Sequence, residues 1–226
     1  MTQIVVDSSS LITISGNCFI NLLKHLTEQE KISFLMPESV YYESVQKPVK
    51  IKRFELNAIR IRDCVEEGYL KLIKTTPSIK RTMEELSTVS ANIYKVKGKQ
   101  FRLIDLGEAE TLALMKEINS ELLLIDERTT RMLIEEPQNV LEFLQRRHRC
   151  NVEFDHESIQ KFSNLFGKIK IIRSVELIAL SYENGCFAKE MHKTKQALEA
   201  ALYAAKFAGC AVSFEEIKGF LKNVRN

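Results

Sequence analysis

Two short apolar segments that lie far apart in the chain each end at an aspartate. Residues 4–6 read Ile-Val-Val and precede Asp7, and residues 122–125 read Leu-Leu-Leu-Ile and precede Asp126. Short apolar runs bounded by polar residues are typical of buried strands. A carboxylate at such a position is unfavourable unless a positive group pairs with it. A hard divalent cation such as Mg²⁺ or Mn²⁺, which prefers oxygen ligands, would supply that group.

Helical segments separate the predicted strands. Strands that alternate with helices predict an α/β fold with a mostly parallel sheet. In such a sheet, ligands bind beyond the carboxyl ends of the strands, near the point where the strand order reverses. Asp7 and Asp126 are expected at that edge. Strands are expected over residues 4–6, 32–36, 69–73, 122–125 and 169–172, and helices over residues 8–14, 18–25, 37–45, 51–65, 82–95, 106–118, 128–135, 140–147, 174–182, 188–206 and 213–223.

The length suits one large domain, or a core with an appended piece. The chain has 226 residues, of which 45% are hydrophobic and 28% are charged, and this composition is that of an ordinary globular protein. We expect a modest boundary near Gly185. It would divide a core domain over residues 1–185 from a C-terminal helical extension over residues 186–226, which packs on the core or forms a dimer interface.

Charge and cysteine usage exclude several classes of protein. The net charge of +3 is too small for a strongly basic nucleic-acid binder, but it allows a local basic groove. The five cysteines are odd in number and form no C-x-x-C pair, which indicates reduced thiols. The N-terminus lacks the pattern of a signal peptide, and no apolar run approaches the ~18 residues of a membrane span. We therefore expect a cytoplasmic protein with no membrane contact.

Further acids lie on predicted helices that can face the same crevice. Glu43 follows the second strand, and Glu108 lies in the first turn of the helix before the strand that ends at Asp126. Simpler interpretations remain open, because Glu43 also fits a solvated helix face and Glu108 also fits the helix dipole. Asp105 is a candidate helix cap whose capping-box partner would be Glu108, or it replaces Glu108 as an acid of the site. Glu127 is a candidate supplement to Asp126.

The order of these motifs resembles that of PIN domains, in a branch with a G-E-x-E helix before an apolar strand and two acids. The resemblance covers roughly residues 3–185. It implies an α/β/α sandwich with a mostly parallel central sheet and extra C-terminal helices. The four stretches that carry it are residues 4–12 (IVVDSSSLI), 37–44 (PESVYYES), 106–114 (LGEAETLAL) and 123–131 (LLIDERTTR).

PIN domains carry three or four acids around one or two metal ions. By resemblance, Asp7, Glu43, Glu108 and Asp126 are the first to fourth acids and the ligands of Mg²⁺ or Mn²⁺. Ser9 matches a small polar position beside the first acid, where it orients Asp7 or holds a water; a helix cap is an equal alternative.

The resemblance implies a metal-dependent ribonuclease that cleaves single-stranded RNA by two-metal phosphodiester hydrolysis. A catalytically weak or inactive module that binds RNA or a protein partner is the alternative, and an unrelated α/β protein is a third. A homodimer, and an antitoxin as partner, are family-level expectations.

Three other folds with an aspartate after the first strand fit less well. A haloacid-dehalogenase phosphatase needs D-x-D, but residue 9 is serine. A von Willebrand A-type metal site needs D-x-S-x-S, but residue 11 is leucine. A receiver domain needs a phospho-acceptor aspartate on a middle strand, and none is evident. The four histidines form no triad or zinc spacing.

Basic segments flank the acidic motifs. Lys95, Lys97, Lys99 and Arg102 are predicted to lie in or beside a basic loop before the Glu108 helix and to contact the RNA backbone. An ordinary solvated loop is the alternative. Residues 146–149 hold three more arginines at a predicted helix end, where cations are also favoured by the helix dipole.

Overall fold

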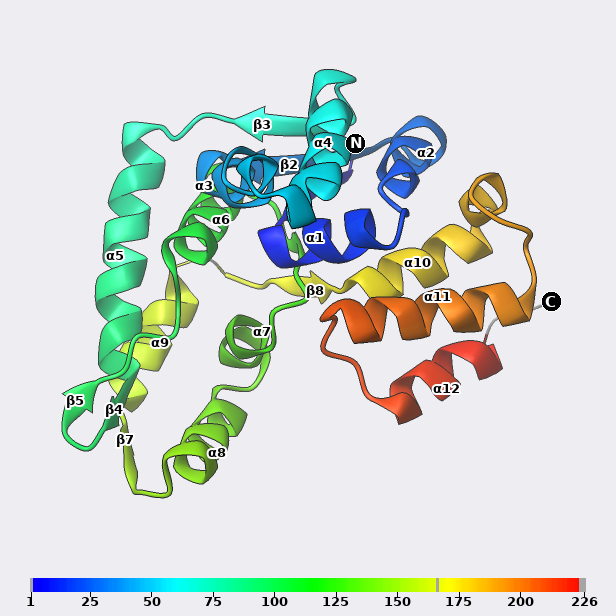
Figure 1. Cartoon of the computed structure of the whole chain (residues 1–226). Helices are drawn as coiled ribbons and strands as arrows, with labels where there is room; N and C mark the ends of the chain where they lie inside the picture. The colour runs from blue at the N-terminus through cyan, green and yellow to red at the C-terminus, as the bar shows by residue number, and fades with distance from the viewer. Residues whose placement is uncertain (1, 166, 224–226) are drawn as a thin grey trace.

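The computed structural model describes residues 2–165 and 167–223, and its centre is a five-stranded sheet (Figure 1). All strand pairs of this sheet are parallel, and the spatial order is β3-β2-β1-β6-β8. The predicted α/β class is confirmed, as a sandwich with helices on both faces of the sheet. The strands are β1 (Thr2–Val6), β2 (Ile32–Pro37), β3 (Leu70–Ile73), β6 (Leu122–Leu124) and β8 (Lys170–Ile172).

The strand order reverses between β1 and β6. From β1 the chain builds outward to β2 and β3, and it later returns to the other side of β1 with β6 and then β8. Val5 pairs with Leu35 on one side and with Leu123 on the other. Asp7 and Asp126 follow these two central strands, so the sequence correctly placed both acids at the reversal point.

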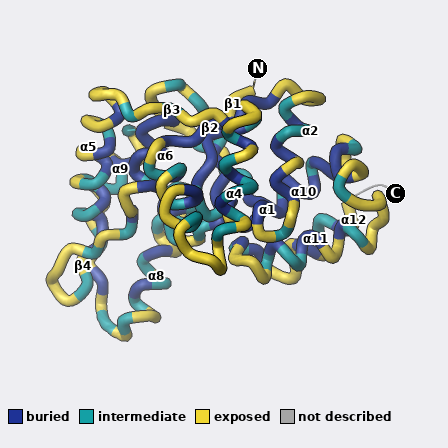
Figure 2. Tube along the Cα trace, turned by 45° about the horizontal axis from the view of Figure 1, so that its top comes forward, coloured by how far each residue is buried: buried dark blue, intermediate teal, exposed yellow. Residues whose placement is uncertain are grey.

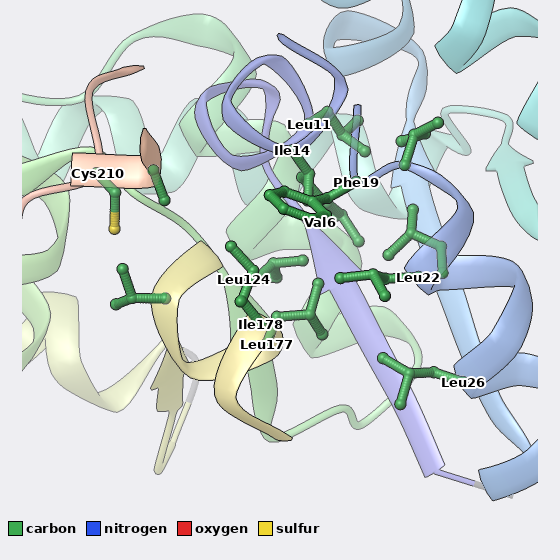
Figure 3. Close-up of a cluster of buried hydrophobic side chains, with 14 of the residues drawn as sticks. Val6, Leu11, Ile14, Phe19, Leu22, Leu26, Leu124, Leu177, Ile178 and Cys210 are labelled. Carbon is green, nitrogen blue, oxygen red and sulfur yellow. The ribbon is translucent and has the colours of Figure 1, made fainter. Parts of the chain in front are cut away.

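Alternating side chains of the strands enter two separate cores. Val6 and Leu124 belong to one buried cluster, whereas Val5 and Leu123 belong to the other. Figure 3 shows the first cluster, in which the strand residues meet side chains of α1, α2 and α10. This alternation is why the central strands β1, β2 and β6 have consecutive buried residues that point to both faces of the sheet.

The described helices are α-helical except for three short turns, two of which follow one another after α3. A π-helical turn, η1 (Tyr42–Gln46), continues α3 (Glu38–Tyr41), and a 3-10 turn, η2 (Pro48–Lys50), follows it. The remaining helices are α1 (Ser8–Gly16), α2 (Asn21–Glu30), α4 (Lys52–Glu66), α5 (Pro77–Ile93), α6 (Leu106–Glu117), α7 (Arg128–Glu135), α8 (Pro137–His148), α9 (His156–Asn164), α10 (Ser174–Glu183), the 3-10 turn η3 (Cys186–Lys189), α11 (Lys195–Ala208) and α12 (Phe214–Asn223).

The last two helices share the first core. Leu198 and Leu202 of α11, and Ile217 and Leu221 of α12, are buried in the same cluster as Val6 of the central strand. Arg173, at the start of α10, ties α12 to this body through an ion pair with Glu216 at 2.8 Å. Figure 2 shows the resulting pattern, with a mostly buried central sheet.

Three predicted segments were wrong in detail. The expected loop over residues 95–99 is a hairpin of β4 (Tyr94–Val96) and β5 (Lys99–Gln100), which pairs with β7 (Val152–Phe154) in a second, antiparallel sheet. Lys97 and Gly98 both have positive φ, as the two-residue turn of a hairpin requires. The predicted helix over residues 188–206 begins at Lys195, where Thr194 caps it, and the predicted helix over residues 82–95 begins at Pro77.

Among the described residues, no helix combines the length and the apolar character that a membrane crossing requires.

Candidate functional site

Asp7 is a buried carboxylate at the junction of β1 and α1. Its side chain is 3% exposed. Its Oδ2 accepts hydrogen bonds from the backbone N–H of Ser9 at 2.9 Å and from the Ser9 hydroxyl at 2.6 Å. Burial, and after it the nearby charge of Glu43, raise the pKa of Asp7, although the bonds from Ser9 oppose the shift. Asp7 therefore caps α1 and also carries a charge that is costly without a cation.

Ser9 connects the two central strand ends. While its hydroxyl donates to Asp7, the same oxygen accepts the backbone N–H groups of Asp126 at 3.1 Å and Glu127 at 3.2 Å. The N-cap of α1 is Asp7, and Ser9 only donates its backbone N–H to that cap, so the alternative of Ser9 as a helix cap is wrong. Its hydroxyl bond to Asp7 agrees with the orienting role.

Glu43 reaches the site from the π-helical turn η1. Its Oε2 accepts a hydrogen bond from the Ser8 hydroxyl at 3.0 Å, and its Oε1 faces Gly107 in the first turn of α6. A Cβ atom on Gly107 would lie 2.9 Å from Oε1, closer than such atoms approach in proteins. A side chain at residue 107 would therefore push the flexible Glu43 carboxylate out of its observed position. Such π-helical turns are frequent at functional sites.

Glu108 faces both the helix start and the acid cluster. Its Oε2 accepts the backbone N–H of Asp105 at 2.5 Å, as in a capping box, and its Oε1 accepts the Thr130 hydroxyl at 2.8 Å. Burial raises the pKa of Glu108 to about 7, and the nearby charges of Asp7 and Glu127 add to the shift. The capping role thus leaves Glu108 within electrostatic range of Asp7.

Asp126 is directed toward α10. Its Oδ1 accepts the backbone N–H of Ser174 and its Oδ2 accepts the Ser174 hydroxyl, each at 2.7 Å. Burial, and the Asp126 carboxylate beside it, raise the pKa of the Cys210 thiol, which lies between α11 and α12. Asp126 is only 1% exposed, and through its two bonds to Ser174 it connects the end of the central sheet to α10.

The neighbouring acids have distinct positions. Glu127 caps α7 by accepting the N–H groups of Thr129 at 2.8 Å and Thr130 at 2.6 Å, and its charge acts on Glu108. Asp105 is exposed at the start of α6. Glu110 is buried on the opposite side of α6, where it accepts the backbone N–H of Ser39 at 2.8 Å, as the angle between Glu108 and Glu110 on a helix predicts.

The structure thus brings Asp7, Glu43 and Glu108 together. The hydrogen-bond partners given above for these three carboxylates are hydroxyl and backbone N–H groups. Each of these carboxylates is oriented by its own hydrogen-bond partners. Among the described residues, no three acids, histidines or cysteines have the spacing of a metal site. The cluster matches a divalent cation in its donor atoms and in its uncompensated charge, and its side chains would have to turn toward the ion.

The predicted basic contacts lie elsewhere. Lys95, Lys97 and Lys99 are exposed on the β4–β5 hairpin, and Arg102 follows it. Figure 1 shows this hairpin at the lower left, well away from α1 near the centre. Lys95 pairs with Glu153 at 3.9 Å, and the Arg102 side chain donates to the backbone oxygen of Ile104 at 3.2 Å. Contact of these residues with RNA stays a prediction.

Several residues that shape the site carried no evident signal. Ser8, Thr130 and Ser174 each bind one of the acids, from positions that sequence analysis left unassigned. Gly107 was visible inside the G-E-x-E motif. A glycine in the first turn of a helix, where it weakens the helix, is a sign of close approach by another group.

A family model, DUF3368, described as a PIN domain, matches residues 3–138 of the chain. The match extends from β1 to the start of α8 and contains every acid of the candidate site, from Asp7 to Glu127. No curated protein and no solved structure matches the chain.

Proposed function

We propose that this chain, which belongs to the PIN-domain family, is a metal-dependent ribonuclease that hydrolyses single-stranded RNA. The observation that carries the proposal is the group of Asp7, Glu43 and Glu108 at the reversal point of the sheet. These carboxylates come from three separate segments, and Asp7 and Glu108 have raised pKa values because they are buried close to other acids. Such perturbation in a crevice is typical of functional sites.

Asp7, Glu43 and Glu108 are the residues that would hold Mg²⁺ or Mn²⁺. The ion would supply an acidified water and positive charge at the scissile phosphate, which is the chemistry of phosphodiester hydrolysis. Ser9 keeps Asp7 oriented and fixes the β6 end beside it. Gly107 leaves room for the Glu43 carboxylate. Asp126, the predicted fourth acid, and Glu127 stay candidate supports of the site.

Cation dependence and one substitution together test the proposal. Labelled single-stranded RNA is incubated with the protein in Mn²⁺ or Mg²⁺ and in EDTA. We expect cleavage with the cations only. In the same assay, we expect Gly107→Ala to lose about tenfold or more of the activity, because the new Cβ displaces Glu43, and a misplaced group of this kind costs on that order.

Gly219→Ala is the matched control. Gly219 is also helical, in α12, and no atom lies within 4 Å of a Cβ built there. Alanine stabilises a helix by up to about 1 kcal/mol relative to glycine, so neither variant should have a lower melting temperature than the wild type. Cleavage in EDTA, or equal activity of the two alanine variants, would argue against the proposed site.

The pKa of Glu108 predicts opposite trends for stability and for cation binding. Without a cation, the folded chain keeps a proton on Glu108 up to about pH 7, whereas the unfolded chain releases it near the ordinary glutamate pKa of 4.5. The folded state binds more protons between these values, so the free energy of unfolding falls as pH rises from about 4.5 to about 7. Mn²⁺ needs the charged carboxylate, so its affinity rises over the same range.

Melting in EDTA and calorimetric titration with Mn²⁺ across this range measure both trends. Glu108→Gln should flatten the stability profile of this range. Hydrogen bonds from Ser213 and the ion pair with Arg173 lower the pKa of Glu216 to about 2, although burial opposes this shift. Glu216 therefore changes the free energy of unfolding only below about pH 4.5, where stability falls as pH falls. Constant Mn²⁺ affinity across the range would show that Glu108 is no ligand.

A catalytically inactive module that binds RNA or a protein partner is the second candidate. The observation that favours it is that both carboxylate oxygens of Asp126 accept hydrogen bonds from Ser174, so this predicted fourth acid faces α10. We further propose a cytoplasmic location, in keeping with the five free cysteines. A homodimer and an antitoxin partner stay predictions from the family.

A further inference from the structure

An arginine-rich hollow lies beside the acids, between α7 and α8. Helix α7 begins directly after Glu127, and α8 packs against it (Figure 1). The hollow has a volume of about 830 Å³, and four arginines against two glutamates line it, so its walls carry excess positive charge. We call it the arginine groove. Its charged residues are Arg128, Arg131, Arg146, Arg147, Glu135 and Glu136.

Two of these arginines stack on one aromatic ring. The guanidinium carbons of Arg128 and Arg147 lie 5.6 Å and 6.0 Å from the centre of the Phe143 ring. Within the described part of the chain, neither arginine forms an ion pair, whereas Arg146 pairs with Glu142 at 2.9 Å. The ring holds two uncompensated guanidinium planes in place, and such planes both bind phosphate and stack on bases.

Arg131 adds a third guanidinium group to the lining. It forms an ion pair with Glu135, but the 3.7 Å between its Nε and the Glu135 oxygen is too long for a hydrogen bond. Arg128 and Arg131 also line a second hollow of about 410 Å³, which Lys206 borders. The positive surface thus continues from α8, past the start of α7, to the C-terminal helices.

We propose that the arginine groove binds the backbone of single-stranded RNA and leads the strand to the acids. The ligand is identified by its chemistry: phosphates for the guanidinium groups, and unstacked bases for the planes of Arg128 and Arg147. A duplex keeps its bases stacked and offers only phosphates. The choice of RNA rests on the proposed function, while binding itself requires neither a cation nor cleavage.

Fluorescence anisotropy of a labelled oligoribonucleotide in EDTA tests this groove. For the double variant Arg128→Gln/Arg147→Gln we expect about tenfold weaker binding. The slope of log affinity against log salt should also fall by about 0.7 for each phosphate contact that is lost. Arg128→Lys/Arg147→Lys keeps the charge, so it should keep the salt slope while losing affinity, because lysine offers no plane for stacking.

Lys31→Gln/Lys116→Gln is the matched control, because it removes the same charge from two exposed lysines that precede β2 and β6, at the edge of the sheet opposite the acids. Equal weakening by the control variant and the groove variant would overturn the proposal, as would wild-type affinity in the groove variant. If polyglutamate displaces the labelled RNA as well as unlabelled RNA does, the groove binds acidic proteins instead. Tighter binding of duplex RNA than of single-stranded RNA would exclude base stacking. If the groove binds RNA as expected but the wild type cleaves none with Mn²⁺, the ribonuclease proposal fails and this inference stands.

Discussion

Asp7→Asn is expected to abolish RNA cleavage while the fold becomes more stable. Loss of a partner behind a metal ligand costs about 10- to 100-fold, so loss of a ligand should cost more than about 100-fold in cleavage rate. Burial and the Glu43 charge raise the pKa of Asp7, so its charged form opposes folding near neutral pH. Asparagine removes the charge and remains as good a helix cap as aspartate. Cleavage rate with Mn²⁺ and melting temperature in EDTA measure the two effects.

Asp63→Asn is the control for this substitution. The Asp63 side chain is 53% exposed on α4 and lies 3.7 Å from Arg62. The Asp63→Asn substitution should change neither the cleavage rate nor the melting temperature measurably, because exposed ion pairs contribute little to stability. If Asp7→Asn cleaves RNA like the wild type, Asp7 is not part of a catalytic site. If it melts much earlier than the wild type, the Asp7 charge contributes to the fold rather than opposing it.

Ending the chain after Gly185 is expected to unfold the protein. The deletion removes the buried residues Leu198, Leu202, Ile217 and Leu221 from the core that contains the central strand. Each buried side chain of this kind contributes about 1.5–3 kcal/mol. A whole domain is stable by only about 5–15 kcal/mol. The deletion also exposes the apolar side chains that these residues cover. Circular dichroism and size-exclusion chromatography of the truncated chain measure the loss.

Two point variants on α11 compare the contribution of a buried side chain to stability with that of an exposed one. Leu202 is fully buried, so Leu202→Ala should lower the free energy of unfolding by about 2–5 kcal/mol. Phe207 is 75% exposed on the same helix, so Phe207→Ala should change it by less than about 0.5 kcal/mol. A truncated chain that melts cooperatively near the wild-type temperature would show that residues 186–226 are an independent appendage.

The sequence was most informative where local pattern and tertiary structure agree. All five strands of the central sheet were predicted, because each is a short apolar run that ends at polar or helix-starting residues. Since β1 and β6 lie side by side, the two aspartates that follow them also lie at one edge. Helix α7 was predicted with its observed bounds, as residues 128–135.

The remaining features depend on contacts that no local pattern records. Glu43 reaches the site from η1, a π-helical turn, and the local sequence does not distinguish such a rare turn from an ordinary α-helix. Ser174 lies 48 residues after Asp126 in the chain, and it donates hydrogen bonds to both carboxylate oxygens of Asp126. The strands of the second sheet are only two or three residues long, too short to show an alternating pattern.

The Ser9 hydroxyl has a consequence for the order of events during folding. It contacts the Asp7 carboxylate and the amides of Asp126 and Glu127, which lie 117 and 118 residues further along the chain. The surroundings of Asp7 and of Asp126 can therefore take their final form only once β6 has docked beside β1. A nascent chain that ends before β6 would hold Asp7 without this brace. The site thus depends on contacts between distant segments of the chain, and it is expected to open only when the central strand pair separates.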